Sequence, residues 1–509
     1  MPHYPLEEPE VKENQTKLRK HLIQPEALRL VPEALARKYA AIPLEISGNV
    51  LHVAMANPGD IIALEALASQ SQMHIVPETA SAEEIREAID FNYQSYEEIE
   101  KQISSISLPP EEEGIKLDTV TDAPVVRALT LIIDEAVKAR ASDIHLDPQE
   151  DKLLIRCRID GTLHDMLSLP LMTATSLISR IKILANMNIA DHHRPQDGQF
   201  SITTKSGQSI DIRVGTVATV HGEMAALRLL DKSRAIMTLT DLGFLSECLS
   251  KYQEMLKVPY GMLLVSGPTG AGKTTSLYAS VNCLDCKGRN IITIEDPVEY
   301  RFRNINQIQV NPRAGLTFAS GLRSILRLDP DVILVGEIRD AETARIAVQA
   351  ALTGHLVLSS IHANDAVGVV FRLLDLGIEP FLVASALIGV VAQRMARRVC
   401  PDCAQPVEVP LLEQMAYAKE TGEKRREFVC GTGCKSCSYT GFQGRTGIFE
   451  ILKITDEIRM MLLNGTTSSQ LRAQAMKEGM MPLIKNGMLK VKENIITPAE
   501  VLRNAYTAE

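Results

Sequence analysis

The stretch Met262–Thr275 (MLLVSGPTGAGKTT) decides the fold, because it joins an apolar run to a glycine-rich loop. Residues 262–265 are typical of a buried strand, and Gly267–Thr275 matches the pattern GxxxxGK[ST], with a helical segment after it. In such a loop the backbone N–H groups surround a β-phosphate, and the helix dipole adds to their field. Lys273 supplies a positive charge to the β- and γ-phosphates, and Thr274 places a hydroxyl on Mg²⁺. The sequence therefore predicts a phosphate-binding loop made of Gly267, Pro268, Thr269, Gly270, Ala271, Gly272, Lys273, Thr274 and Thr275.

Two further apolar strands end in acidic residues. Asn290–Ile294 (NIITI) leads into Glu295 and Glu299, and Val332–Val335 (VILV) is followed closely by Glu337. Ligands of an open parallel sheet bind at the carboxyl ends of its strands, so these acids and the phosphate loop are expected to share one crevice. One acid would hold Mg²⁺ through water, and another would orient or deprotonate the attacking water. The alternative is that the acids are solvated turn residues.

A glycine, Gly336, stands where proteins with this loop usually carry an aspartate. We infer that direct Mg²⁺ ligation from this strand is weak and that Glu337 serves the water. A fourth strand, Leu356–Ser359 (LVLS), has His355 before it and His362 after it. These histidines are candidate γ-phosphate sensors, which would gain a hydrogen bond with a triphosphate and lose it with a diphosphate. The alternative is that they are ordinary core histidines.

The chain has 509 residues, 45% of them apolar and 23% charged, which is typical of a globular protein with three or four domains. Short apolar strands alternate with helical stretches, so the fold class is α/β with a parallel sheet around the phosphate loop. In the first segment, Pro25–Tyr39 is expected to form one helix. The predicted segments are a docking module (1–93), a flexible linker (94–117), a second α/β domain (118–237), the phosphate-loop domain (238–398), a cysteine-bearing insert (399–445) and a helical region (446–509).

Composition excludes several classes of protein. The formal net charge is −9, which argues against a general nucleic-acid coat. The longest apolar run is Phe381–Ala392, and its twelve residues are fewer than the roughly twenty that span a bilayer. The N-terminal stretch is polar and acidic, without an export signal. We therefore expect a cytoplasmic protein without a transmembrane segment, in which cysteines are thiols or metal ligands.

Four of the cysteines form two CxxC pairs about thirty residues apart. They are Cys400, Cys403, Cys434 and Cys437. Thiolates at this spacing make a tetrahedral Zn²⁺ site, and four protein ligands leave no position open for a substrate. The sequence thus predicts a structural zinc that clamps an arm projecting from the sheet domain, with unmetallated reduced thiols as the alternative.

Several motifs together resemble the secretion ATPase family that drives type II secretion and type IV pilus assembly. The resemblance runs from about residue 118 to the end and more loosely through the first module. Leu328 replaces a usual Gln of the family, and Ser360 and Ala363 replace usual Thr residues, but no charge is lost. The matching stretches are Ala141–Pro148 (ASDIHLDP), Arg194–Gln199 (RPQDGQ), Thr293–Tyr300 (TIEDPVEY, an aspartate box), Leu328–Asp340 (LDPDVILVGEIRD, an atypical Walker B) and Thr353–Asp365 (TGHLVLSSIHAND, a histidine box).

The resemblance implies a RecA-like ATPase that uses ATP and Mg²⁺ and forms a homohexamer. It implies that arginines of the second domain reach the nucleotide, and these match Arg213 and Arg228. Such arginines would stabilise transition-state charge only when the domains close. The alternative is that they form structural salt bridges. The implied partners are the cytoplasmic parts of membrane platform proteins, with the motor at the cytoplasmic face of the inner membrane.

The preferred function is therefore the ATPase of type II secretion. The first alternative is a type IV pilus assembly ATPase, and the cysteine pairs argue against a retraction motor. A more distant alternative is a nucleic-acid translocase, which the acidic charge and the 4% aromatic content disfavour, because aromatic residues are the platforms on which bases stack. A scaffold that binds ATP without hydrolysing it is disfavoured by Glu337 together with Lys273.

Overall fold

A computed structural model of the chain describes residues 23–86, 88–90, 93, 123–205, 207–231, 237–284, 288–438 and 440–505. The chain divides into two compact units, and each is described by itself. The first holds residues up to Leu230 together with Thr432–Gly441, and the second holds the remainder. The predicted linker 94–117 lies outside the described residues.

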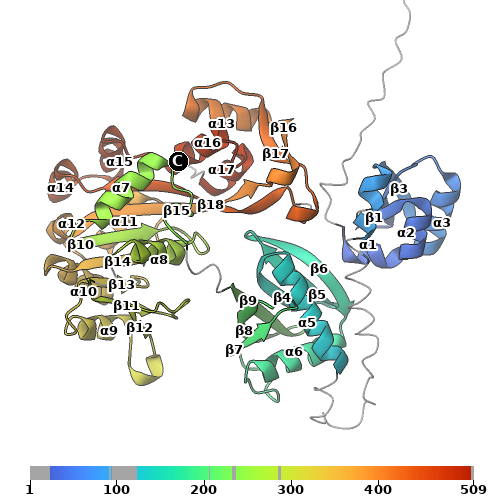
Figure 1. The fold of residues 1–509 in the computed structure, drawn as a ribbon, viewed down its shortest axis with the longest axis horizontal. Coiled ribbons are helices and arrows are strands. Elements are labelled where there is room, and N and C mark those ends of the chain that lie inside the picture. Colours follow the sequence, from blue (N-terminus) through green and yellow to red (C-terminus); the bar gives the residue numbers. More distant parts are fainter. Residues whose placement is uncertain are drawn as a thin grey trace, which may run out of the picture. The chain divides into compact units, whose positions relative to one another are not determined.

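The first module is a small α/β structure with a three-stranded sheet in the order β1-β2-β3 (Figure 1). Strands β1 and β2 are antiparallel, whereas β2 and β3 are parallel. Apolar side chains from the sheet and its helices, such as Leu51 and Leu67, form one buried cluster. The elements are α1 (Pro25–Leu30), α2 (Glu33–Tyr39), β1 (Ala41–Ser47), β2 (Val50–Met55), α3 (Ile61–Ser71) and β3 (His74–Thr79).

The single helix predicted over Pro25–Tyr39 is wrong, because the chain forms two short helices there. Val31, the last residue before a proline, has extended backbone angles of φ −124° and ψ 105°. A proline disfavours the helical conformation in the residue before it, so the first helix ends at Leu30. Pro32 then begins the second helix as its N-terminal cap.

The second domain has a six-stranded sheet in the order β6-β5-β4-β9-β8-β7. Its central strand β4 pairs antiparallel with β5 and β9. One cluster of buried side chains joins α5 and α6 to the sheet, with Ile132, Ile155 and Leu177 among its members. The elements are α5 (Ala123–Lys138), β4 (Ala141–Pro148), β5 (Lys152–Ile159), β6 (Thr162–Pro170), α6 (Thr173–Leu184), β7 (Gln196–Thr203), β8 (Ser209–Thr219) and β9 (Gly222–Asp231).

The second unit is built on a seven-stranded sheet in the order β12-β11-β13-β14-β10-β15-β18. The pairs from β12 to β15 are parallel, which confirms the predicted α/β class, and only β18 at the edge is antiparallel. The strands are β10 (Gly261–Ser266), β11 (Ile291–Glu295), β12 (Asn306–Gln309), β13 (Val332–Val335), β14 (Leu356–Ile361), β15 (Leu387–Val399) and β18 (Phe442–Lys453).

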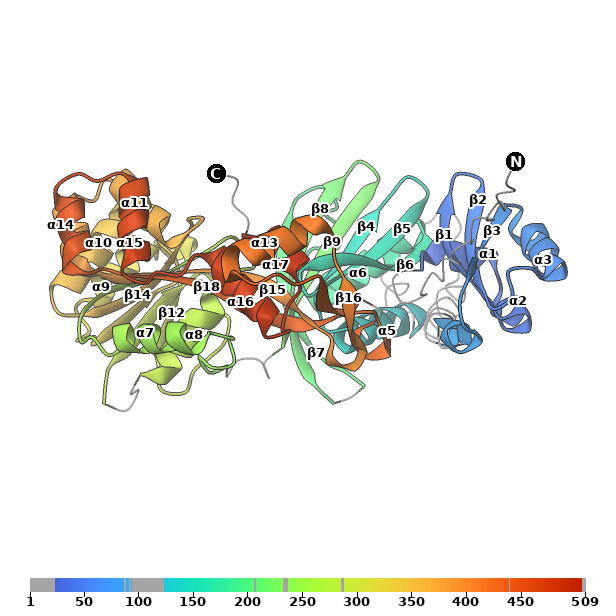
Figure 2. The same ribbon diagram turned by 90° about the horizontal axis from the view of Figure 1, so that it is seen from above.

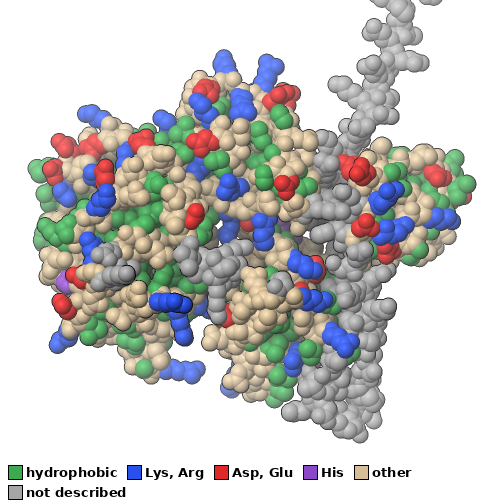
Figure 3. Space-filling model, viewed as in Figure 1, with side chains coloured by type: hydrophobic (Ala, Val, Ile, Leu, Met, Phe, Trp, Pro, Cys, Tyr) green, Lys and Arg blue, Asp and Glu red, His purple; other side chains and the backbone are tan. Residues whose placement is uncertain are grey.

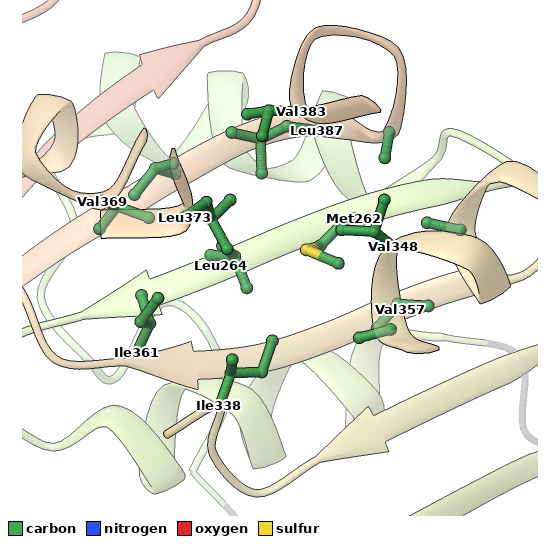
Figure 4. Close-up of a cluster of buried hydrophobic side chains, with 14 of the residues drawn as sticks. Met262, Leu264, Ile338, Val348, Val357, Ile361, Val369, Leu373, Val383 and Leu387 are labelled. Atoms are coloured by element: carbon green, nitrogen blue, oxygen red, sulfur yellow. The ribbon is translucent and has the colours of Figure 1, made fainter. Parts of the chain in front are cut away.

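Helices cover both faces of this sheet (Figure 2). Alternate residues of β10 point to opposite faces. Met262 and Leu264 therefore join the cluster shown in Figure 4, and Leu263 and Val265 join the cluster on α7 and α8. The helices are α7 (Ser246–Leu256), α8 (Lys273–Cys283), α9 (Phe318–Ile325), α10 (Ala341–Leu352), α11 (Ala366–Asp375) and α12 (Pro380–Ala386).

The C-terminal part corrects one predicted boundary. The region expected to be helical from residue 446 begins inside β18, where the buried stretch Gly447–Leu452 extends the sheet as an edge strand. Among the described residues, no helix is long and apolar enough to cross a membrane. The remaining elements are β16 (Ala404–Glu408), α13 (Leu411–Thr421), β17 (Glu427–Gly431), α14 (Asp456–Leu463), α15 (Ser468–Lys477), α16 (Leu483–Lys492) and α17 (Pro498–Ala505).

Candidate functional site

The phosphate loop lies at the carboxyl end of β10, as predicted. Every residue of β10 is buried, and α8 begins at Lys273 directly after the loop. Pro268, Thr269 and Gly270 are exposed at the edge of the sheet, and so is Thr274. The loop thus presents its backbone at the surface while both of its ends are fixed in the core.

Two glycines of the loop fit the role of a phosphate cradle. Gly267 and Gly272 have φ angles of +153° and +83°, which favour glycine. A Cβ atom on Gly267 would lie 2.5 Å from the carbonyl oxygen of Gln393. The backbone can therefore wrap this tightly only without side chains, and the residues present fit an ATP phosphate together with Mg²⁺ at Thr274.

The Lys273 ammonium lies over the start of its own loop. Its Nζ donates to the carbonyl oxygens of Gly267, at 2.7 Å, and Pro268, at 3.2 Å. Burial lowers the pKa of Lys273, the neighbouring Glu337 carboxylate opposes that shift, and Arg394 adds to it. The ammonium therefore has an acidic neighbour and a basic neighbour at the loop.

Glu337 and His362 meet at the same edge of the sheet. The register pairs Val335, the last residue of β13, with Ser359 on β14, which continues in parallel to Ile361, so both strands end at the same edge. Oε2 of Glu337 lies 3.6 Å from Nε2 of His362, and Oε1 pairs with Arg339. The ion pair with Glu337 raises the pKa of Arg339. Their neighbours in sequence, Ile338 and Ile361, point into the core (Figure 4), which fixes this edge.

Tight packing accounts for Gly336 at the end of β13. A Cβ atom there would lie 3.3 Å from the carbonyl oxygen of Ile294 and 3.4 Å from Cα of Glu295. The carbonyl of Gly336 also accepts a hydrogen bond from Oγ of Ser360, at 2.8 Å. A side chain at this position would require the neighbouring strand to shift by a few tenths of an ångström, and the first acid after β13 is Glu337.

Glu295 is buried in the sheet layer, with 3% of its surface exposed. Its carboxylate accepts hydrogen bonds from Thr293 Oγ1 at 2.6 Å, from Gln307 Nε2 at 3.1 Å and from the Tyr278 hydroxyl. The same Tyr278 oxygen accepts the backbone N–H of Glu299, at 3.2 Å. Glu295 thereby ties α8 to the end of β11. Catalytic roles of Glu295 and Glu299 stay predictions.

The two histidines lie at opposite ends of β14. His362 follows the strand on the phosphate-loop side, whereas His355 precedes it. Nδ1 of His355 lies 2.9 Å from the carbonyl oxygen of Ala350, and its own backbone oxygen accepts the N–H of Gly261 at the start of β10. The structure therefore brings His362 to Glu337, whereas His355 lies at the other end of the strand. Of the two histidines, His362 is the one placed to act as a γ-phosphate sensor.

The two predicted arginine fingers lie on strands of the first unit. Arg213 is on β8 and Arg228 is on β9. Nε of Arg228 donates to Oδ1 of Asp143 at 3.0 Å, although 62% of the arginine side chain remains exposed. This contact is the salt bridge that the alternative interpretation expects, and the reach of these arginines to a nucleotide stays a prediction.

The two cysteine pairs come together as predicted. The sulfur atoms of Cys400, Cys403, Cys434 and Cys437 all lie within 4.8 Å of one another. The insert that carries them leaves the sheet where Val399 pairs with Phe442. Sγ of Cys437 accepts the backbone N–H groups of Cys434, at 3.2 Å, and Gly441, at 3.3 Å. Four close sulfurs with N–H donors around one of them fit a Zn²⁺ ligand set.

Two residues near the phosphate loop, Gln393 and Arg394, were not predicted from the sequence. They follow Ala392 on β15, which pairs with Ser266 at the end of β10. Nε2 of Gln393 donates to the carbonyl oxygen of Ala271 at 2.6 Å, and its Oε1 accepts from Oγ of Ser276 at 2.8 Å. The sequence signal for them was the same as for Glu295 and Glu337, because Gln393 and Arg394 are polar residues that directly follow an apolar run, Phe381–Ala392.

Comparison with known proteins gives the same assignment as the motifs. Residues 118–503 match the family described as Type II/IV secretion system protein, and residues 12–98 match the MshEN domain. The type IV pilus assembly ATPase PilB of Myxococcus xanthus is 41% identical over 95% of this chain and 87% of its own length. The type II secretion system protein E of Pseudomonas aeruginosa is 45% identical over 77% of this chain and 78% of its own length.

Solved structures show the same fold. The Legionella pneumophila ATPase DotB has a TM-score of 0.56 at 20% identity, over 78% of this chain and 98% of DotB. The pilus retraction motor PilT, solved with bound ADP, has a TM-score of 0.52 at 25% identity, over 74% of this chain and 97% of PilT. The predicted RecA-like fold, the family resemblance and the ATPase activity are thus confirmed.

Proposed function

The chain belongs to the type II/IV secretion ATPase family, and from that membership we propose that it is the motor of type II secretion. ATP hydrolysis would drive the assembly of pilin-like subunits into a pseudopilus and so export folded proteins. The observation that carries the hydrolytic part of the proposal is Glu337, which lies 3.6 Å from His362 and acts electrostatically on Lys273 at the edge that bears the phosphate loop. Lys273 supplies a positive charge for the phosphates, Glu337 a base for the attacking water, and His362 a hydrogen bond to the γ-phosphate.

Each residue acts on a different part of the reaction. The loop N–H groups and Lys273 hold the phosphates, and Thr274 would hold Mg²⁺, which neutralises charge on the phosphate oxygens when bound. Glu337 is held between Arg339 and His362, so its carboxylate is oriented at the edge where water attacks. His362 would hydrogen-bond the γ-phosphate and respond to its loss.

Replacing Glu337 by glutamine tests the hydrolytic part. Glu337→Gln keeps the shape of the side chain but removes the base, so we expect phosphate release to fall by about 10²- to 10⁴-fold while ATP binding persists. Binding of a labelled ATP and release of phosphate are measured on the same preparation. Wild-type turnover in this variant would remove Glu337 from the mechanism.

Type IV pilus assembly is the second candidate. It is supported by the pilus assembly ATPases among the relatives, such as PilB of M. xanthus, which is 41% identical over 95% of this chain. The two candidates separate in a strain that lacks the chain. Loss of exported enzymes from the medium, with surface pili retained, indicates type II secretion, and the reverse indicates pilus assembly.

A nucleic-acid translocase is not favoured. Acidic and basic side chains both occur on the visible face of each unit (Figure 3), and the formal net charge is −9. Hydrolysis is therefore expected to be independent of added DNA. DNA stimulation that falls steeply with salt would favour a translocase instead.

Oligomerisation and docking complete the proposed motor. A homohexamer would let Arg213 and Arg228 sense nucleotide bound at a subunit interface. The first module and the cysteine-bearing arm would pass domain movements to platform proteins at the cytoplasmic face of the inner membrane. The chain would thus be a cytoplasmic protein held peripherally at that membrane.

Zn²⁺ is the proposed ion of the four-cysteine cluster. Four thiolates fill a tetrahedral shell, so the metal would clamp the arm without taking part in hydrolysis. We expect one zinc per chain by elemental analysis, and loss of that zinc in Cys434→Ser with turnover largely retained. Cys430, which lies on β17 and is not a member of the four-cysteine cluster, offers a matched control, because Cys430→Ser should keep the metal. A full zinc content in Cys434→Ser would contradict the site.

A further inference from the structure

Arg394 lies beside the phosphate loop without being part of the predicted site. It follows Gln393 on β15, so the two side chains point to opposite faces of the strand. Gln393 supports the loop from within the core, as described above. A Cβ atom placed on Gly267, the first residue of the loop, would lie 3.6 Å from Nη1 of Arg394. The guanidinium thus reaches the loop where it leaves β10.

The same guanidinium holds the segment that carries His362. Nη2 of Arg394 donates to the carbonyl oxygen of Asn364 at 2.7 Å, two residues after the histidine. Nη1 lies 3.3 Å from the carbonyl oxygen of Gln393. A planar guanidinium can make such contacts in fixed directions, which a lysine ammonium cannot reproduce. Arg394 therefore connects the phosphate loop with the segment after β14.

Asp365, the next residue of that segment, is held by a second arginine, Arg472 on α15. Asp365 caps helix α11, because its Oδ1 accepts the N–H of Gly368 at 2.7 Å. Its Oδ2 pairs with Nη2 of Arg472 on α15, also at 2.7 Å. Nη1 of Arg472 lies 3.7 Å from Glu450, which is 2% exposed and accepts the N–H of Ala366 at 2.8 Å.

The charges at the loop favour a polyanion as the partner of Arg394. Burial lowers the pKa of Arg394, as it does that of Lys273, and the two cations repel each other. The carboxylates of Asp365 and Glu450 offset part of this cost. A nucleotide phosphate bound in the loop would offset the rest.

We propose that Arg394 is a positioning residue for ATP hydrolysis, which holds the His362 segment against the phosphate loop while Arg472 holds it from α15. The proposal rests on the use of the phosphate loop as the ATP site. Its consequence is a physical connection from the γ-phosphate to the C-terminal helices. When His362 loses its phosphate contact, the segment it belongs to moves relative to these two arginines, and Arg472 is on α15.

Arg394→Gln is the first test. We expect kcat to fall about tenfold, the scale of one charged hydrogen bond, while the Kd for ADP changes by less than about threefold. Arg394→Lys restores the charge without the planar fork, so nucleotide affinity should stay at the wild-type level while kcat remains low. A merely structural role would instead lower the unfolding midpoint and would leave kcat per folded molecule unchanged, and that result would overturn the proposal.

Arg472→Gln tests the far anchor. We expect kcat to fall about threefold, although this residue lies on α15 rather than at the loop. In the double variant the two losses should not multiply, because both residues hold one segment. Arg459→Gln is the matched control, since Arg459 on α14 pairs with Asp456 at 2.8 Å outside this connection, and its kcat should equal that of wild type. Losses that multiply independently would contradict the shared role.

Lys273→Ala separates this inference from the proposed function. If Lys273→Ala still binds ATP as wild type does, the nucleotide site itself is wrong and the proposal falls with it. If Lys273→Ala loses binding while Arg394→Gln keeps a wild-type kcat, the ATPase assignment stands and only the role of Arg394 is overturned.

Discussion

Two lysines, Lys273 at the phosphate loop and Lys490 on α16, show how the same chemistry serves two purposes. Burial lowers the pKa of both, to about 8 for Lys490. Lys490 is 1% exposed, and its ammonium donates to the carbonyls of Gly243 and Gly447 and to Oγ1 of Thr446 at 3.2 Å. Three hydrogen bonds, the full donor capacity of an ammonium group, therefore go to the protein itself.

The difference lies in where the acceptors come from. The acceptors of Lys490 belong to β18 and to the segment before α7, so this lysine fastens separate parts of the second unit. Lys273 instead donates to the carbonyls of Gly267 and Pro268, which belong to its own loop. A buried lysine that is satisfied by distant elements stabilises the fold, whereas one that is held by its own loop at the surface can meet a ligand.

Lys490→Met should give the largest change in stability. The substitution leaves the carbonyls of Gly243 and Gly447 buried without their donor, so we expect the free energy of unfolding to fall by roughly 2–5 kcal/mol. Denaturant unfolding followed by circular dichroism measures it. Lys492→Met is the matched control on the same helix, because Lys492 is exposed in an ion pair with Glu423, and its loss should be within about 1 kcal/mol. Equal losses in the two variants would contradict the fastening role.

The pH dependence of unfolding should show a smaller effect of the same lysine. Its pKa is about 8 in the folded chain against 10.5 ordinarily, so between these values the unfolded chain binds more protons. The free energy of unfolding must then rise with pH over that window, by up to about 3 kcal/mol from this group. The difference between wild type and Lys490→Met, measured at pH 7 and at pH 10, isolates it. A difference that stays flat or falls would contradict the lowered pKa.

Local patterns were sufficient to predict the phosphate-loop domain. A buried strand, a glycine-rich loop and a following helix are contiguous in the chain, and so are β11 with Glu295 at its end and β13 with Glu337 two residues beyond it. The spacing of the two CxxC pairs likewise predicted that their four sulfur atoms come together. The broken helix at Val31–Pro32 was also within reach, because proline acts on its immediate neighbour.

Contacts between distant residues were not predictable in the same way. Gln393 supports the phosphate loop only because β15 lies next to β10 in the sheet. The order of the strands cannot be predicted from the sequence of either strand. The burial of Glu295 under Tyr278 depends on the same assembled sheet. Residue type indicated possible chemistry, and the topology decided which groups meet.

Titration of Mg·ATP into the full chain and into Lys273→Ala tests the central claim most directly. The account predicts that Lys273→Ala loses affinity by about 100-fold or more, because a charged partner of the phosphates is removed from a partly buried site. Its free energy of unfolding should stay within about 1 kcal/mol of wild type, in contrast to Lys490→Met. Unchanged ATP affinity in folded Lys273→Ala would show that the loop Gly267–Thr275 does not hold the nucleotide.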